Sequence, residues 1–489
     1  MTTESASGSA AGPERAGGRE GGLAAPMRHP IPWQDESWTD PAALDAELRR
    51  VFDICHGCRR CFNLCDSFPR LFDLIDESDT GELDSVASEG FKPVVDACTL
   101  CDMCFMTKCP YVPPHEFDLD FPHLMLRARA VEAKKGIPVA DRELARTDRN
   151  GRVMTSSPLV AGLANWASRT GNRVMRKGLE AVAGVDAKAH LPAYARRPLV
   201  KEARRTAPAI NRDAPGFGRK AVLYATCYGN WNDSAIGQAA RAVLAKNGVE
   251  SEVVHPGCCG MPVLEQGRMA EVADSAREIA HTLAPWIADG YDVIALVPSC
   301  ALMLKFEWPL ILPGNDQVES LARATFDLAE YVVALAKGPG LAPGLGRLER
   351  PVTLHLACHA RAQNMGAKAA EMLRLIPDMS PAIVERCSGH GGAWGIKKGN
   401  FDTALKVGKP VARQAAKGAT ETGALVSSEC PLAGAHILQG VERLAGDDNT
   451  AAEPAAGRQT RAPHPIEILA AAYGLADLPA AINEKAAAR

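Results

Sequence analysis

Two groups of four cysteines lie near the N-terminus, and their spacing is typical of iron–sulfur ligands. The first group has the pattern C-x2-C-x2-C-x3-C and consists of Cys55, Cys58, Cys61 and Cys65. The second has the pattern C-x2-C-x2-C-x4-C, precedes a proline, and consists of Cys98, Cys101, Cys104 and Cys109. Two such groups in tandem predict two [4Fe–4S] clusters, so electron transfer is the first hypothesis for this chain.

The spacing also predicts how the ligands are shared. Three thiolates at short, equal steps surround one face of a cluster, whereas the fourth thiolate of each group binds the other cluster. We therefore expect one cluster on Cys55, Cys58, Cys61 and Cys109. We expect the other on Cys98, Cys101, Cys104 and Cys65. The competing interpretation is structural zinc, but four-cysteine zinc sites usually contain two C-x2-C pairs separated by a longer stretch.

Composition limits the compartment and the partners. The chain has 489 residues, enough for two or three domains, and its formal net charge of −3 indicates no particular charged partner. It has neither a secretory signal nor an uncharged apolar run of about 18 residues. Fifteen cysteines without an export signal indicate reduced thiolates in the cytoplasm. We expect a cytoplasmic protein, with peripheral association at the inner face of the cytoplasmic membrane as a further option.

From about residue 220 onward, cysteines recur at similar spacings after apolar strands. Strands are predicted within AVLYATC and VIALVPSC of the first repeat, and within VTLHLAC and ALVSSEC of the second. Helical segments such as SAIGQAARAVLAKNG alternate with these strands, which predicts an α/β fold with parallel sheets. The cysteines then lie at the carboxyl ends of strands, where open α/β sheets bind ligands.

Each repeat offers a second kind of cysteine site. The cysteines of the first repeat are Cys227, Cys258, Cys259 and Cys300. They can bind a third [4Fe–4S] cluster or zinc, or act as redox thiols. Those of the second repeat are Cys358, Cys387 and Cys430. This set needs a further ligand, for which His359 and then His390 are the candidates, whereas His355 alternates with leucines and is expected to be structural.

The two repeats resemble the CCG domains of the heterodisulfide reductase B-subunit superfamily. The matching segments are both N-terminal cysteine groups, the CCG and PSC segments of the first repeat, and HLACHARAQNMG and SECPLAG of the second. The N-terminal groups resemble an α-helical ferredoxin module that precedes such domains in respiratory subunits. The whole layout resembles the iron–sulfur subunits of anaerobic glycerol-3-phosphate dehydrogenase, and iron–sulfur subunits of glycolate and lactate oxidases share it. The resemblance implies a subunit that passes electrons from a flavin dehydrogenase toward quinone or another carrier.

The sequence departs from the family pattern at three positions. A full CCG site has five cysteines, and Met303 stands at the fifth position of the first repeat. In the second repeat, Ser388 and Ala433 stand where cysteines are expected. A five-cysteine noncubane cluster is therefore not expected in either repeat.

These observations predict an α/β protein with an N-terminal α-helical two-cluster ferredoxin module and two tandem CCG-type domains with parallel sheets. The predicted parts are a disordered tail (1–35), the ferredoxin module (40–123), a basic helical linker (124–218), the first CCG-type domain (219–315), a degenerate second CCG-type domain (350–445) and a C-terminal tail (446–489). The linker forms a solvated face, or docks an acidic partner or an anionic membrane. Nucleic acid is not expected, because no binding motif accompanies the charge.

Three functions stay open on the sequence. The first is an electron-transfer subunit that works with a flavin dehydrogenase and a quinone or another carrier. The second is a disulfide or thiol reductase with its active site in the first repeat. The third is a partner-binding scaffold, which the missing cysteines favour for the second repeat.

Overall fold

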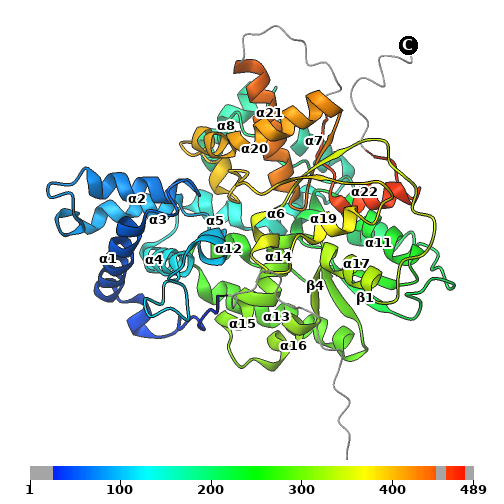
Figure 1. Cartoon of the computed structure of the whole chain (residues 1–489), viewed down its shortest axis with the longest axis horizontal. Coiled ribbons are helices and arrows are strands. Elements are labelled where there is room, and N and C mark those ends of the chain that lie inside the picture. Colours follow the sequence, from blue (N-terminus) through cyan, green and yellow to red (C-terminus); the bar gives the residue numbers. More distant parts are fainter. Residues whose placement is uncertain (1–25, 448–458, 479–489) are drawn as a thin grey trace, which may run out of the picture.

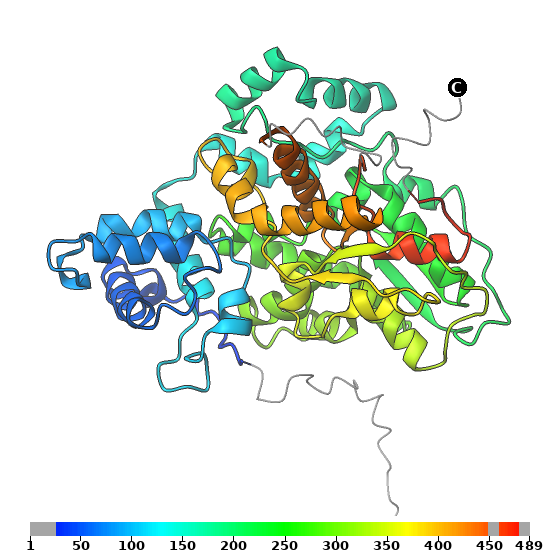
Figure 2. The ribbon, with the colours of Figure 1, turned by 45° about the horizontal axis from the view of Figure 1, so that its top comes forward.

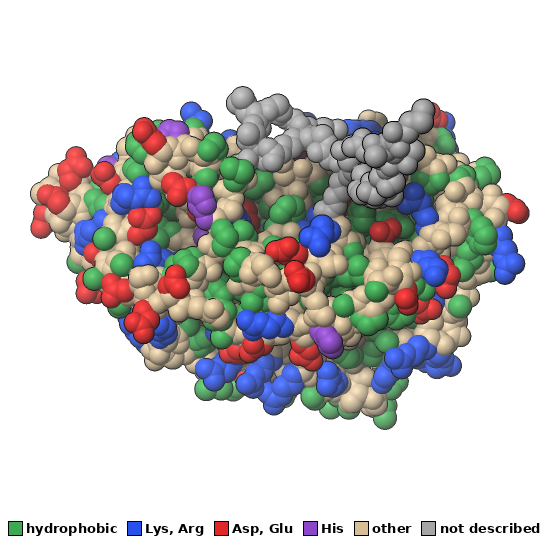
Figure 3. Space-filling view, turned by 90° about the horizontal axis from the view of Figure 1, so that it is seen from below, with side chains coloured by type: hydrophobic (Ala, Val, Ile, Leu, Met, Phe, Trp, Pro, Cys, Tyr) green, Lys and Arg blue, Asp and Glu red, His purple; other side chains and the backbone are tan. Residues whose placement is uncertain are grey.

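The computed structural model describes residues 26–447 and 459–478 and has a mixed α/β fold with parallel sheets (Figure 1). The N-terminal helices lie to one side of the sheets, which are formed by the middle and C-terminal parts of the chain. Within the described residues, no helix is both long enough and apolar enough to cross a membrane. Acidic and basic side chains are mixed over the face in Figure 3, with Lys and Arg gathered along its lower edge.

The N-terminal helices surround the two four-cysteine groups. They are α1 (Pro41–Cys58), α2 (Ser67–Asp76), α3 (Lys92–Ala97) and α4 (Phe121–Lys135), with the short turns η1 (Glu36–Thr39), η2 (Leu83–Ser85), η3 (Ser88–Phe91) and η4 (Cys104–Lys108). Helix α1 begins at Pro41, because the Asp40 carboxylate accepts the Ala43 amide at 2.7 Å and Pro41 fits the first turn. Its buried stripe consists of Leu44, Leu48, Val51 and Phe52.

The predicted linker is helical, but it does not begin at residue 124. Its helices are α5 (Val139–Ala145), α6 (Thr147–Met154), α7 (Pro158–Ser168), α8 (Arg173–Ala183) and α9 (Leu199–Ala203). The predicted boundary at residue 123 lies inside α4, whose Leu124 and Leu126 side chains are buried. The first part of the predicted linker is therefore a core helix, because the apolar stripe of α4 continues past the predicted boundary.

The first sheet has the strand order β2-β1-β3-β4, and its strands are parallel. The strands are β1 (Lys220–Tyr224), β2 (Glu250–Val254), β3 (Asp292–Ala295) and β4 (Thr325–Asp327). Tyr224 is in register with Val254 on one side and with Ala295 on the other, so three strands end at one edge. The chain passes from β1 to β2 on one side and then to β3 on the other, which creates a switch point at that edge.

The helices around the first sheet follow its strands in the predicted alternation. They are α10 (Cys227–Trp231), α11 (Ser234–Lys246), α12 (Met261–Leu264), α13 (Met269–Ala288), α14 (Pro298–Leu302), α15 (Trp308–Ile311), α16 (Asp316–Ala324) and α17 (Leu328–Lys337), with the π-helical turn η5 (Met303–Glu307).

The second sheet has the order β6-β5-β7 and is also parallel (Figure 2). Its strands are β5 (Val352–His355), β6 (Ala382–Val384) and β7 (Leu425–Ser428). Its helices are α18 (Cys358–Arg361), α19 (Lys368–Leu373), α20 (Phe401–Thr422) and α21 (Pro431–Asp447), with the turn η6 (Trp394–Ile396). Each sheet thus contains the pair of strands that the sequence predicts for one repeat.

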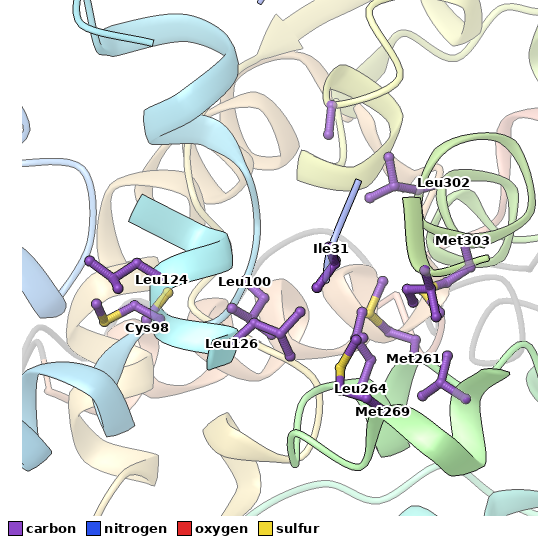
Figure 4. Close-up of a cluster of buried hydrophobic side chains, with 14 of the residues drawn as sticks. Ile31, Cys98, Leu100, Leu124, Leu126, Met261, Leu264, Met269, Leu302 and Met303 are labelled. Atoms are coloured by element: carbon purple, nitrogen blue, oxygen red, sulfur yellow. The ribbon is translucent and has the colours of Figure 1, made fainter. Parts of the chain in front are cut away.

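Two large hydrophobic cores lie on opposite faces of the first sheet. Val222 and Tyr224 of β1 belong to one core, whereas Ala221 and Leu223 of the same strand belong to the other. The first core continues into the N-terminal helices, where apolar side chains of α4 approach Met261 and other residues that follow the first sheet's strands (Figure 4). The second core continues into the second sheet and its helices.

Parts of both predicted tails are folded. Residues 1–25 of the predicted N-terminal tail lie outside the described residues, but the Ile31 side chain is buried and the Trp33 indole donates to the Ile311 carbonyl at 2.9 Å. The predicted C-terminal tail contains α22 (Pro465–Ala472), whose Ile466 and Leu469 side chains are fully buried in the second core. These segments are ordered because their apolar residues pack against elements that are distant in sequence.

Candidate metal centres

The first cavity brings together the four cysteines of the first predicted ligand set. Cys55, Cys58, Cys61 and Cys109 line one cavity, which is also lined by Phe68, Phe72, Tyr111 and Leu119. Cys55 and Cys58 lie in the last turn of α1, and Arg59 then adopts a left-handed conformation (φ 51°) that ends the helix before Cys61. The apolar walls of the cavity shield the thiols from water.

Cys109 reaches this cavity through the wide turn η4. Its amide donates to the Cys104 carbonyl at 2.8 Å, a five-residue step that accommodates the extra residue of the second cysteine group. The longer final gap, C-x4-C, therefore has a structural reason. The same turn leaves Cys104 in the second cysteine cluster, while Cys109 lies in the first.

The second predicted ligand set is also brought together. The charges of Cys101, Cys98 and Cys65, and to a smaller extent that of Cys61 of the first set, act on the Cys104 thiol. Cys65 is the thiol of the second predicted set that comes from the other sequence group, and the charges of Cys101 and Cys98 act on it. Leu100 and Asp102 both have positive φ angles, 48° and 64°, which lets this short loop turn its cysteines inward.

The chemistry of these thiols fits a cluster with several iron atoms. Burial, followed by the neighbouring thiols, raises the pKa of Cys61 to about 11, and burial raises that of Cys101 to about 12. Such thiols become thiolates at neutral pH when a cationic group replaces their protons. Across residues 26–447 and 459–478, no three Cys, His, Asp or Glu side chains lie close enough to hold a single metal ion. Four thiols that line one cavity have the number and the chemistry of the ligands that a [4Fe–4S] cluster takes.

A buried ionic network holds the second cysteine loop against the rest of the protein. Arg28 donates to Asp102 at 2.7 Å, to Asp120 at 2.9 Å and to Glu307 at 3.0 Å. His123 lies between Asp120 and Glu307. Although burial opposes it, the positive charges of His123 and Arg28 lower the pKa of Glu307 to about 2. The network joins the loop next to Cys101 to η5, which follows the first sheet.

A third group of thiols lies at the carboxyl edge of the first sheet. Cys227 begins α10, Cys258 and Cys259 follow β2, and Cys300 lies in α14. The sulfur atoms of Cys258 and Cys227 are 4.0 Å apart. Hydrogen bonds from Cys227, Cys259 and Thr147 hold the pKa of Cys258 well below its usual value, although burial raises it. Met303, which stands at the position of a fifth cysteine, is fully buried in the first core.

Sequence reasoning missed the contribution of α6 to this group. The Thr147 hydroxyl donates to the Cys258 sulfur at 3.4 Å, and Asp148 accepts from Trp231 at 2.8 Å and contacts His255 at 2.5 Å. A side chain at Gly151 would collide with Trp231, so this glycine allows α6 to lie against the site. The glycine is the one sequence signal of this approach, and it is too common a residue to identify the contact.

The second sheet carries Cys358, Cys387 and Cys430 at the ends of its strands. The predicted fourth ligand, His359, has other partners in the structure: its ring nitrogens lie 2.8 Å from the Ser299 hydroxyl and 3.3 Å from the Leu100 carbonyl. His390 lies beside His436, with ring centroids 6.0 Å apart. The structure therefore places three thiols at this edge, whereas the His359 ring nitrogens bond to groups outside it.

His355 has the structural role that the sequence predicts. Its ring nitrogens lie 2.9 Å from the Ser428 hydroxyl and 3.1 Å from the Arg386 carbonyl, which ties β5 to β7 and to the loop after β6. Burial lowers the pKa of His355 to about 4, so the ring is neutral at physiological pH.

The thiol groups follow one another through the molecule. The charges of Cys387 and Cys358 are close enough to Cys101 for them to interact, which brings the second-sheet group next to the second N-terminal group. Cys430 in turn lies near enough to Cys300 for the same interaction. The second-sheet group is therefore a neighbour of both the second N-terminal group and the first-sheet group.

The fold and the sites define a class of cysteine-rich α/β protein with thiols at the carboxyl ends of parallel strands. The family model of the CCG cysteine-rich domain matches residues 221–305, which contain the first-sheet group. The chain is similar to a subunit of anaerobic glycerol-3-phosphate dehydrogenase, the one designated C, from Escherichia coli K12. The two are 26% identical over 321 residues, 64% of this chain and 76% of that protein.

Two further relatives cover less of the chain. Lactate utilization protein A of Bacillus cytotoxicus is 23% identical over 223 residues, 43% of this chain and 87% of that protein. Lactate utilization protein A of Bacillus pumilus is 26% identical over 187 residues, 36% of this chain and 75% of that protein. The resemblance to the dehydrogenase subunit that the sequence motifs predict is thus confirmed by the comparison over most of the chain.

Proposed function

We propose that this chain is an iron–sulfur subunit that relays electrons between a flavin dehydrogenase and quinone or another redox carrier. The observation that carries the proposal is the crossed grouping of the N-terminal cysteines, in which Cys109 lines the first cavity and Cys65 lies with the second group. Similarity to a subunit of a dehydrogenase supports the same role.

In this proposal, the N-terminal module holds two [4Fe–4S] clusters, one on each crossed set of four thiolates. Each bound cluster supplies one-electron chemistry. The chain supplies the ligands, excludes water through Phe68 and Phe72, and sets the local charge. The Arg129 guanidinium next to the second set donates to the Cys98 and Val95 carbonyls and so fixes the cysteine loop.

The order of the thiol groups supports a longer path than the sequence suggests. From the sequence, the first-sheet group is the expected destination of electrons from the N-terminal module. The structure brings Cys387 and Cys358 near Cys101, and Cys430 near Cys300. We therefore propose that a redox centre on the second-sheet group, if one is bound, lies on the path between the other groups.

The test is iron and sulfide analysis with electron paramagnetic resonance on protein purified without oxygen. About 8 iron atoms per chain correspond to two clusters, and about 12 correspond to a third cluster. Changing Cys58 and Cys101 to serine is expected to remove both N-terminal signals and electron transfer. Changing Cys358 to serine is the matched control and is expected to keep the first 8 iron atoms. Electron transfer that survives the double substitution contradicts the proposal.

A second function, reduction of a disulfide or thiol substrate at the first-sheet group, is favoured by Cys258. A thiol with a lowered pKa, 4.0 Å from a second thiol, has the properties of a redox nucleophile. If this function is correct, changing Cys258 to serine abolishes turnover of a disulfide substrate but leaves reduction of the N-terminal clusters unchanged. Loss of both, or of neither, contradicts it.

A third function, a partner-binding scaffold in the second repeat, is favoured by the partners of His359. Because Ser299 and Leu100 occupy its ring nitrogens, three thiols remain for a metal at the second sheet. Iron or zinc that is lost when Cys387 is changed to serine contradicts the scaffold function. Metal content that is unchanged by this substitution, with partner capture retained, supports it.

A further inference from the structure

Helices α7 and α8 expose large apolar side chains on the outside of the molecule. Leu159 is 85% exposed, Leu163 is 65% exposed and Trp166 is 52% exposed on α7. On α8, Val174 is 75% exposed and Val182 is 80% exposed. We call these five side chains the α7–α8 surface. Figure 2 shows the two helices along an outer edge of the protein, away from the N-terminal helices.

Helix α8 buries one charged side chain and exposes apolar ones. Arg176 is fully buried, and its guanidinium donates to the Asp186 and Ala189 carbonyls at 2.7 Å. Glu180, one turn later, accepts the Ala187 amide at 3.0 Å. A surface helix normally turns its charged face to water and its apolar face to the core. Here Arg176 is turned inward, and Val174 and Val182 lie on the outside beside the exposed Arg173 and Lys177, so apolar side chains of α8 are available for a partner.

Helix α7 has no charged side chain along its length. The Ser157 hydroxyl caps its start, and Ala161 is its buried residue. Leu159, Leu163 and Trp166 are spaced at i, i+4 and i+7, so they share one face. An exposed apolar patch of this kind marks an interaction site, and tryptophan is enriched where proteins meet the surface of a bilayer.

The charge around this surface is positive. Exposed cations on α6, α8 and the intervening loop are Arg152, Arg169, Arg173 and Lys177. Glu180 is the sole carboxylate between residues 149 and 185, and it pairs with Lys398 at 3.2 Å. Apolar side chains bordered by exposed cations complement a bilayer whose headgroups are anionic.

We propose that the α7–α8 surface is the part of this protein that binds an anionic membrane surface. This inference rests on the proposed function, because it takes the electron carrier to be one that is held in the membrane. A bilayer suits these observations better than a protein partner does. The apolar residues lie on an outer edge and not in a groove, and a lipid surface requires no matching shape.

The experiment is sedimentation of the full chain, purified without oxygen, with lipid vesicles. One set of vesicles contains phosphatidylcholine and phosphatidylglycerol, and the other contains phosphatidylcholine alone. The test variant carries Leu159→Gln, Leu163→Gln and Trp166→Gln. The matched control carries Ile210→Gln, Phe217→Gln and Leu475→Gln, which are also exposed but lie outside the surface. A second test variant carries Arg169→Glu, Arg173→Glu and Lys177→Glu.

Wild type and the control are expected to sediment with the anionic vesicles, and the α7 variant to bind at least about tenfold more weakly. The charge variant is expected to lose the preference for phosphatidylglycerol. Wild type that does not bind either vesicle, or an α7 variant that binds like wild type, overturns the inference. So does an α7 variant that binds vesicles normally but no longer binds a dehydrogenase subunit. Because vesicle binding is measured without electron transfer, protein that binds vesicles but contains no iron contradicts the proposed function alone.

Discussion

Replacing Arg28 with methionine is expected to destabilise the attachment of the second cysteine loop. Arg28 is the shared cation of Asp102, Asp120 and Glu307, and its side chain is 11% exposed. Methionine fills similar space but leaves three carboxylates with His123 as their remaining basic neighbour. Removing one partner from a buried ionic network costs about 3–5 kcal/mol.

The pKa of Glu307 gives a similar free energy for the interactions within this network. Its lowering from 4.5 to about 2 corresponds to roughly 3 kcal/mol of interaction with the charges around it. Because the folded-state pKa is lowered, this stabilisation is present above about pH 4.5 and is lost as the pH falls toward 2. The deficit of the Arg28→Met variant is therefore expected to be largest near neutral pH and to shrink in acid.

The assay is thermal unfolding across this pH range, together with iron content at neutral pH. The control is Arg50→Met, because Arg50 forms an exposed ion pair with Glu47, and such pairs contribute about 1 kcal/mol or less. Arg28→Met is expected to lose the iron of the second set before that of the first, since Asp102 directly follows Cys101. An Arg28→Met variant as stable as the control at neutral pH, or a deficit that grows in acid, refutes the reasoning.

Three further predictions follow from particular contacts. Gly151→Val places a Cβ inside the van der Waals contact distance of Trp231, so it is expected to destabilise the protein by about 1–3 kcal/mol. The same variant is expected to slow alkylation of Cys258 in metal-free protein. Gly178→Val is the control, because the space around Gly178 is open, and it is expected to have neither effect. Burial raises the pKa of Glu265 to about 7, so the melting temperature is expected to fall as the pH rises from about 4.5 to 7. Glu265→Gln is expected to remove the contribution of Glu265 to this dependence of melting temperature on pH. Leu469→Ala is expected to lower the free energy of unfolding by about 2–5 kcal/mol, measured with a denaturant, because Leu469 is fully buried. Leu475 is exposed, so Leu475→Ala is the control and is expected to change stability little. Equal effects of the two substitutions would show that α22 is not part of the core.

Local patterns predicted the features whose determinants are close together in the sequence. The strands that precede Cys227 and Cys358 depend on apolar residues a few positions apart, and they form as β1 and β5. The crossed grouping of the N-terminal cysteines joins residues that are far apart in the sequence, and it stays a prediction about the ligands.

Contacts between distant segments could not be predicted in this way. Thr147 reaches Cys258, and His359 reaches Ser299 and Leu100, through tertiary packing that leaves no periodic signal. Arg28 lies in a segment with few apolar residues, and Leu469 lies in an apolar segment of the predicted tail; other parts of the chain supply the environment of both. The sequence patterns therefore identify the cysteines but not the residues that enclose them.

The core that joins α4 to the first sheet has a consequence for biosynthesis. Leu124 and Leu126 leave the ribosome long before Met261 and Leu302, with which they share one core. At about 5–20 residues per second, the N-terminal helices wait for roughly 10 to 30 seconds before those contacts can form. During that interval, the second cysteine set lacks part of its enclosure. We therefore expect stable cluster insertion to occur late in synthesis, after the first sheet has emerged, and not on the nascent N-terminal segment.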